Sequence, residues 1–180
     1  MQLLQAIPQP VIAAVHGTAT AAGCQLVATA DIAIAAPSAK FATPGVNIGL
    51  FCSTPAVALA RCVGQKAAMD MLLTGRMVLA SEALQMGLIS RICSSTGSND
   101  LDSERVAVQA TGLELAREIA KHSGSALSIG KRTFYEQVNK ELDAAYAIAA
   151  EAMVSNIMKR DAQEGMSCFL NRCAPTWRHD

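Results

Sequence analysis

The sequence predicts an α/β fold in which short strands and helices occupy residues 1–100 and a helical region occupies residues 101–180. Three observations support this prediction. Apolar runs of strand length alternate with helical segments up to about residue 92, a polar run follows at 94–100, and apolar residues then recur near helical spacing. Of the 180 residues, 51% are hydrophobic and 17% are charged, which is typical of a globular protein.

The strand-bearing part is organised around residues 11–35. An apolar run at 11–15 predicts a buried strand, His16 and Gly17 a turn, and 32–35 a second strand. Between them, small residues at 19–23 precede a short helix that we expect to begin near Gly23. A ligand can approach such a backbone closely, and the first amides of a helix can hold an anion or a polarised carbonyl oxygen. The alternative is a close-packed strand–helix junction without a ligand.

The remaining elements of this part follow from local signals. Pro55 is a favoured first residue of a helix with Thr54 as its N-cap, and Gly75 and Gly87 each end a helix. The sequence therefore predicts a strand at 40–42, a loop at 44–54, helices at 56–62, 66–73 and 81–86, a strand at 88–92 and a loop at 94–100.

Local signals also predict helices at the N-terminus and over residues 102–171. Residues 1–7 resemble the tail of a helix stopped at Pro8 and Pro10. Asp102 or Ser103 is expected to cap the first long helix. Predicted helices span 102–121, 125–138, 142–160 and 162–171. An apolar stripe on residues 142–160 indicates a packing surface more than a cofactor site. Because no sheet of this chain is expected to cover the stripe, we predict a homo-oligomer. This stripe comprises Ala145, Ile148, Ala149, Ala152, Met153, Asn156 and Ile157.

Composition disfavours several classes of protein. The formal net charge is zero, so nothing suggests a nucleic-acid partner, and no apolar run reaches the roughly 18 residues of a membrane span. The six cysteines form no CxxC pair, which disfavours zinc or another metal and structural disulfides. We therefore expect reduced thiols in the mitochondrial matrix or the cytoplasm.

Four short segments, in this order, resemble the signature of the crotonase family, also called the enoyl-CoA hydratase/isomerase family. They are Gly23-Cys24-Gln25-Leu26 with Asp31-Ile32, Phe41-Ala42-Thr43-Pro44 with Gly49, Thr74-Gly75 with Gly87-Leu88-Ile89, and Glu164-Gly165 through Phe169. The resemblance implies a crotonase-like (ClpP/crotonase) spiral of short strands and helices, truncated at its start, with a helical C-terminal oligomerisation region. The run at 41–55 further indicates one branch of the family.

The resemblance also implies where the chemistry lies. Its second oxyanion donor falls on the backbone N–H of Ala22, and the first donor is expected before Met1. The two catalytic glutamates of hydratases fall on Gln25 and Gly45. An amide has no useful basicity and glycine has no side chain, so we expect hydration to be slower by several orders of magnitude.

Further positions carry over as substrate contacts. Gly23 and Cys52 are expected to line the acyl-CoA site, and Phe169 and Arg172 to contact CoA, often from a neighbouring subunit in relatives. Their i, i+3 spacing predicts one shared helix face, and arginine suits a phosphate. Alternatively, Phe169 lies in a subunit interface and Arg172 is solvated. CoA would enter as part of the substrate, with no resident cofactor, and the relatives form trimers or dimers of trimers.

Other reactive side chains are weaker candidates. Cys24 or Cys52 could act as a thiolate nucleophile, although no histidine lies nearby in sequence. His16 is expected to be a turn residue, and Asp31 and Glu82 to be caps or solvated charges. Three hypotheses remain: an enzyme acting on acyl-CoA (weak hydratase, isomerase or thioester hydrolase), an inactive oligomerising and binding module, and a truncated gene product.

Overall fold

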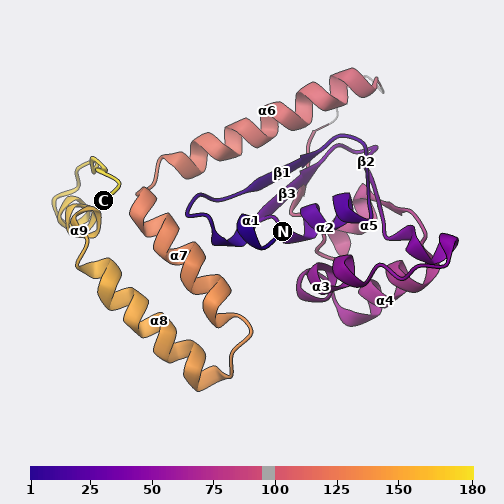
Figure 1. The fold of residues 1–180 in the computed structure, drawn as a ribbon. Helices are drawn as coiled ribbons and strands as arrows, with labels where there is room; N and C mark the ends of the chain where they lie inside the picture. The colour runs from indigo at the N-terminus through magenta and orange to yellow at the C-terminus, as the bar shows by residue number, and fades with distance from the viewer. Residues whose placement is uncertain (95–99) are drawn as a thin grey trace. The chain divides into compact units, whose positions relative to one another are not determined.

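A computed structural model describes residues 1–94 and 100–180 of the chain, which form two compact units (Figure 1). Unit 1 consists of residues 11–116 together with Met1, and unit 2 consists of residues 2–10 and 117–180. Both units share helix α6 (Leu101–Ala120), whereas the predicted domain boundary precedes this helix at residue 101.

Unit 1 contains two three-stranded sheets. In the first, β1 (Ile12–Val15), β3 (Ile32–Ala35) and β6 (Arg91–Ile92) are parallel in the order β1-β3-β6. In the second, β2 (Thr18–Thr20) is parallel to β4 (Lys40–Ala42), and β5 (Val78–Leu79) is antiparallel to β4. Strand β1 is followed in the chain by β2, and β3 is followed by β4 (one helix, α2, lies between β2 and β3). In both cases the first strand belongs to the first sheet and the second strand to the second sheet.

Short helices complete unit 1. They are α2 (Ala22–Thr29), the 3-10 helix η1 (Pro44–Ile48), α3 (Ser53–Cys62), α4 (Gln65–Thr74) and α5 (Ala80–Gln85). The packed core between helices and sheets includes the fully buried side chains of Phe41, Leu59 and Met71. Burying one such side chain stabilises the fold by about 1.5–3 kcal/mol. The sheets and α2 together fix the turn that precedes α2.

The structure confirms most predicted elements of unit 1 and corrects four details. The strand expected at 88–92 is reduced to β6, and β2 and β5 were not predicted, because such short strands depend on pairing with β4. Cys52, not Thr54, is the N-cap of α3, without a side-chain hydrogen bond. Asp100 Oδ2 accepts from Ser103 N (3.1 Å), so neither expected residue caps α6. The predicted loop at 94–100 falls mostly on 95–99, outside the described residues.

Unit 2 consists of helices and a C-terminal tail. Its helices are α1 (Gln2–Ala6), α7 (Gly124–Gln137), α8 (Leu142–Ile157) and α9 (Arg160–Asn171), with the end of α6. Ser123 caps α7 by accepting from Ala126 N (3.3 Å). The ammonium of Lys131 donates to the carbonyls of Leu4 (2.7 Å) and Gln9 (2.8 Å), which ties α1 to α7.

A buried carboxylate organises the tail of unit 2. Asp161, in the first turn of α9, is 2% exposed and accepts from Ser123 Oγ (2.5 Å) and from the amides of Arg178 (2.8 Å) and His179 (3.0 Å). These hydrogen bonds, led by that of Ser123, lower the pKa of Asp161. The carboxylate therefore holds the tail against the start of α7 as an acceptor.

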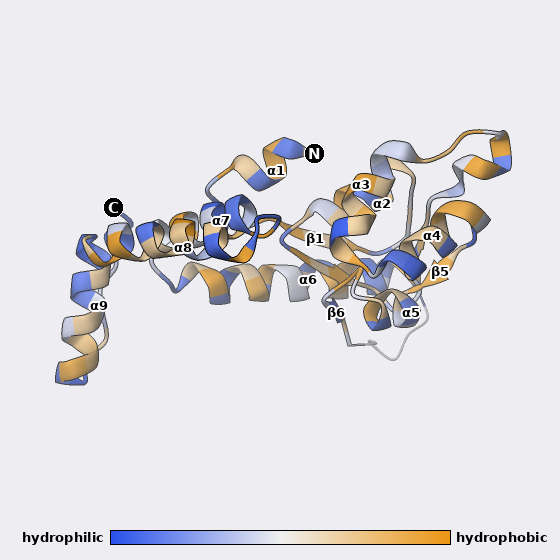
Figure 2. Cartoon of the chain, turned by 90° about the horizontal axis from the view of Figure 1, so that it is seen from below, coloured by the Kyte–Doolittle hydropathy of each residue, from blue (hydrophilic) through white to orange (hydrophobic). Residues whose placement is uncertain are grey.

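Several apolar residues of α8 and α9 in unit 2 are exposed. Figure 2 shows where hydrophobic residues occur along these two helices. On α8, Ala145 and Ile148 of the predicted stripe are half-buried, whereas Tyr146 and Val154 lie exposed outside it. On α9, Phe169 is exposed as well. No helix among the described residues is both long and apolar enough to cross a membrane.

Candidate functional site

The turn before α2 has an unusual backbone conformation. Ala21, the N-cap of α2, has φ 47° and ψ −112°, a combination that is unfavourable for any residue with a Cβ. Two backbone hydrogen bonds hold it: Ala21 N donates to Ala42 O (3.0 Å), and Gln25 N donates to Ala21 O (3.0 Å). Retained strain of this kind is common where a backbone group is positioned for function.

The next residues begin helix α2. The amide of Ala22 is the first of the helix and has no acceptor within it, and Ala22 is exposed. Gly23 is half-buried and a Cβ there would meet only the methyl of Ala19 at 3.9 Å. The start of α2 therefore presents backbone N–H groups with little side-chain cover.

Gln25 lies one turn into α2 and is half-buried. Its backbone carbonyl accepts from Thr29 Oγ1 (2.6 Å), which leaves the side-chain amide as the group that this residue can offer to a ligand. An amide can orient a water or a carbonyl by hydrogen bonds but cannot take up a proton near neutral pH.

Gly45 leaves no space for a side chain. A Cβ built on Gly45 would lie 2.7 Å from Leu50 O and 2.9 Å from Cys52 Sγ, closer than real Cβ contacts. The loop closes on itself here, because Leu50 N donates to Gly45 O (2.9 Å). A glutamate at this position would require the backbone of the loop to move.

Gly75 packs closely against the η1 segment of the same loop. It ends α4 with φ 63°, and a Cβ there would lie 2.9 Å from Asn47 Oδ1 and 3.0 Å from Val46 Cγ2. Sequence reasoning identified Gly75 as a helix end but missed that η1 packs directly on it. The position of η1, and with it of Gly45, thus depends on a close backbone approach.

Burial raises the pKa of two thiols of unit 1. Cys24 is fully buried, and burial, followed by the neighbouring Cys62 and Cys52, raises its pKa to about 12. Burial also raises the pKa of Cys62, whose thiol donates to Gly87 O (3.3 Å). Burial therefore argues against the hypothesis that the helix start activates Cys24, because desolvation disfavours its thiolate.

This burial gives a direct prediction for thiol labelling. At pH 8 we expect Cys24 to react with iodoacetamide on the order of 10²-fold more slowly than the half-buried Cys52, because only the thiolate attacks. Labelling of Cys24 in the folded protein should keep rising with pH up to about 12, the value to which burial raises its pKa. Peptide mass spectrometry of partly labelled protein measures both rates. Equal rates for Cys24 and Cys52 would contradict the burial.

The other candidate side chains of unit 1 have structural partners. Asp31 Oδ2 accepts from Val11 N (2.6 Å) and so joins the start of β1 to the chain before β3. Glu82 pairs with Arg76, and that hydrogen bond lowers the pKa of Glu82. His16 is exposed in the turn between β1 and β2, as predicted. None of these positions requires a catalytic role to explain it.

The predicted CoA contacts of unit 2 do not share a helix face. Phe169 is on α9 and is 84% exposed, but Arg172 lies beyond the last residue of the helix, Asn171. Arg172 has φ 54°, which turns the chain back. The i, i+3 prediction for these two residues is wrong, because it assumed that the helix continues.

The same turn corrects the prediction of reduced thiols. Cys168 and Cys173 are joined by a disulfide with their Cα atoms 4.7 Å apart. The left-handed conformation of Arg172 directs Cys173 back over the last turn of α9, where Cys173 N donates to Cys168 O (2.9 Å). No sequence signal predicts this pairing, because a left-handed residue at a helix end is usually glycine.

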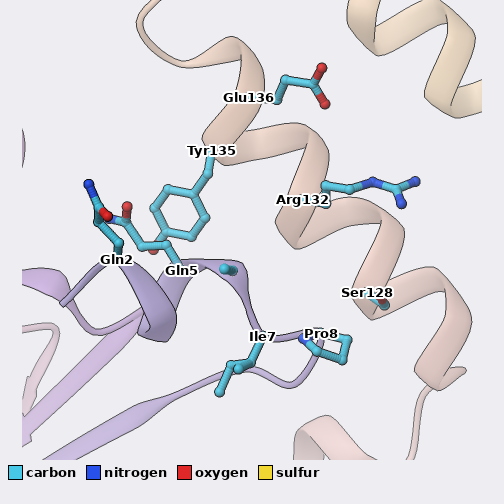
Figure 3. A pocket seen from close by; sticks show the side chains of 9 residues that line it. Gln2, Gln5, Ile7, Pro8, Ser128, Arg132, Tyr135 and Glu136 are labelled. Atoms are coloured by element: carbon cyan, nitrogen blue, oxygen red, sulfur yellow. The ribbon is translucent and has the colours of Figure 1, made fainter.

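A separate hollow of about 490 Å³ lies between α1 and α7 in unit 2 (Figure 3). Gln2 and Gln5 lie beside the ring of Tyr135, whereas Arg132 extends along the opposite side of α7. Its lining also includes Ala6, Ile7, Pro8, Ser128 and Glu136. Sequence reasoning did not predict it. Within the described residues, no group of three or more potential ligands could hold a metal ion.

The strand order and the start of α2 define a crotonase-type fold, and comparison with known proteins agrees. The family model for enoyl-CoA hydratase/isomerase matches residues 1–180, so the chain belongs to this family. Among solved structures, an enoyl-CoA hydratase from Mycobacterium smegmatis superimposes with a TM-score of 0.90 at 43% identity, covering 98% of this chain and 65% of that one.

The branch indicated by residues 41–55 is the one named enoyl-CoA hydratase domain-containing protein 3. Its rat form is 48% identical over 99% of this chain and 56% of the rat protein. The human crystal structure has a TM-score of 0.89 at 47% identity, covering 98% of this chain and 66% of that one. The Escherichia coli 2,3-dehydroadipyl-CoA hydratase is 32% identical over 97% of this chain and 65% of its own. The chain thus spans about half the length of its first curated relatives.

Proposed function

We propose that this protein binds acyl-CoA thioesters at the start of α2 and does not hydrate them by the two-glutamate mechanism. In this proposal the Ala22 amide, with Gly23 beside it, donates to the thioester oxygen. The strained conformation of Ala21 supports this role, since it sets the direction of the peptide that follows and is held by two backbone hydrogen bonds.

The packing around Gly45 supports the proposal that the two-glutamate mechanism does not operate here. At this position neither a glutamate nor an alanine fits without movement of the Leu50 carbonyl and the Cys52 thiol. Together with the amide of Gln25, this leaves both positions of the family's glutamates without a carboxylate. Proton transfer to and from a water then lacks its general acid and base.

Unit 2 would contribute to CoA binding and to assembly. Phe169, and Arg172 beyond the end of α9, would contact CoA. The exposed apolar residues of α8 and α9 favour association of the chain with itself as a trimer or a dimer of trimers. Because the relatives of this branch are named mitochondrial, we assign the protein to the mitochondrion.

The second candidate function is an oligomerising module without an acyl-CoA site. The exposed apolar side chains of α8 and α9, such as Tyr146, Val154 and Phe169, favour it, because association would cover them. This second function requires no ligand at the start of α2. The strained backbone conformation of Ala21 would then serve only the packing of the strand–helix junction.

Calorimetric titration separates the two functions. We expect acetoacetyl-CoA, a thioester that cannot be hydrated, to bind saturably, and free CoA to bind more weakly because it lacks the thioester oxygen. Replacing Ala22 by proline removes the proposed donor, and proline is tolerated at the first position of a helix. This variant should lose the preference for acetoacetyl-CoA. Absence of binding by the folded wild type would favour the module.

A further inference from the structure

The end of α9 brings two cysteines together through the backbone alone. Arg172, in the left-handed conformation, reverses the chain, and Cys173 N donates to Cys168 O (2.9 Å). The Cα atoms of Cys168 and Cys173 are 4.7 Å apart, which lies within the range that a disulfide spans. This helix-end turn therefore holds the two cysteines at a separation that a disulfide can bridge.

The environments of the two sulfur atoms differ. Cys168 is buried and its sulfur lies 3.6 Å from Glu164 Oε1, whereas Cys173 is exposed. An incoming thiol can reach Cys173, and the carboxylate of Glu164 can accept a hydrogen bond from the Cys168 thiol once it is released. Of the six cysteines, all within the described residues, Cys173 is the exposed one.

The tail beyond the disulfide docks on the rest of unit 2. Trp177 Nε1 donates to Lys121 O (2.7 Å), and its ring lies close enough to Gly165 that a Cβ there would be 3.2 Å from it. The amides of Arg178 and His179 bind the buried carboxylate of Asp161. The direction in which the chain leaves Cys173 therefore determines whether these contacts form.

We infer that Cys168 and Cys173 form a reversible thiol–disulfide exchange site, with low-molecular-weight thiols such as glutathione as its reactants, that controls docking of residues 174–180. Glutathione thiolate attacks Cys173 Sγ, the S–S bond breaks, and Cys168 leaves as a thiolate that takes a proton from solvent. A second glutathione thiolate attacks the glutathione sulfur of the mixed disulfide and releases Cys173. Two glutathiones are thereby oxidised to their disulfide as the protein disulfide is reduced.

Reduction removes the restraint on Arg172. The left-handed conformation is energetically unfavourable for a residue with a Cβ, such as Arg172. Without the disulfide the turn therefore opens more readily, and the tail leaves its contacts. The chain contains a single tryptophan, and Trp177 lies in this tail. Its emission therefore reports docking without any dependence on acyl-CoA binding.

The test equilibrates the full chain in reduced or oxidised glutathione, labels free thiols with iodoacetamide and measures Trp177 emission. We expect Cys168 and Cys173 to be labelled only in the reduced buffer and emission to shift to longer wavelength there. Cys173→Ser should show the long-wavelength emission in both buffers, whereas Cys62→Ser, which keeps the pair, should show the same emission as wild type in each buffer. Labelling of both cysteines in the oxidised buffer, or the same wild-type emission in both buffers, would overturn the inference.

Discussion

Replacing Gln25 by glutamate is expected to raise the rate of crotonyl-CoA hydration above that of the wild type but not to restore a full hydratase. The variant would regain one of two proton-transferring groups on α2. Without the second, we expect kcat/KM to stay about 10²–10⁴-fold below that of a family member that carries both glutamates. Initial rates measured at low substrate concentration give this comparison directly.

Gln109→Glu is the matched control for that experiment. It adds the same carboxylate to an exposed position of α6 in the same unit and should leave the rate unchanged. If Gln25→Glu alone matched the two-glutamate relative, the second carboxylate would not be needed, and the reading of Gly45 as a lost catalytic position would fail.

Adding a methyl group at Gly45 is expected to destabilise unit 1 by about 1–3 kcal/mol, as overpacking of a close-packed site does. The new Cβ would meet the Leu50 carbonyl and the Cys52 thiol. Gly45→Glu should lose at least as much. Urea unfolding followed by circular dichroism measures the change in the free energy of unfolding.

Gly17→Ala provides the control, because nothing lies within 4 Å of the Cβ it adds. Adding Cys52→Ala to Gly45→Ala should recover only part of the loss, since the Leu50 carbonyl remains 2.7 Å from the new Cβ. If Gly45→Ala and Gly17→Ala unfolded at the same urea concentration, the packing argument against a side chain at Gly45 would be wrong.

Sequence patterns were sufficient for the parts of the fold that local signals determine. Strands β3 and β4 lie where the apolar runs at 32–35 and 40–42 predict them, and glycines end α4 and α5 as expected. Strands β2 and β5 escaped prediction because each is two or three residues long and forms only by pairing with β4. Their existence depends on neighbours that the local sequence does not reveal.

The motif resemblance nominates Ala22, Gln25 and Gly45 but does not describe the geometry around them. The positive φ of Ala21 has no sequence signal, because alanine rarely adopts it. The closure of the loop over Gly45 depends equally on a backbone carbonyl, which sequence patterns do not describe.

A single-turnover experiment distinguishes binding without hydration from catalysis. Protein in excess is mixed with crotonyl-CoA at a concentration at which calorimetry shows acetoacetyl-CoA to be bound. The thioester is then followed by mass spectrometry, which detects the addition of one water. We expect crotonyl-CoA to remain unhydrated over a time in which a two-glutamate relative completes the reaction. Conversion of the bound thioester to 3-hydroxybutyryl-CoA in that time would contradict it.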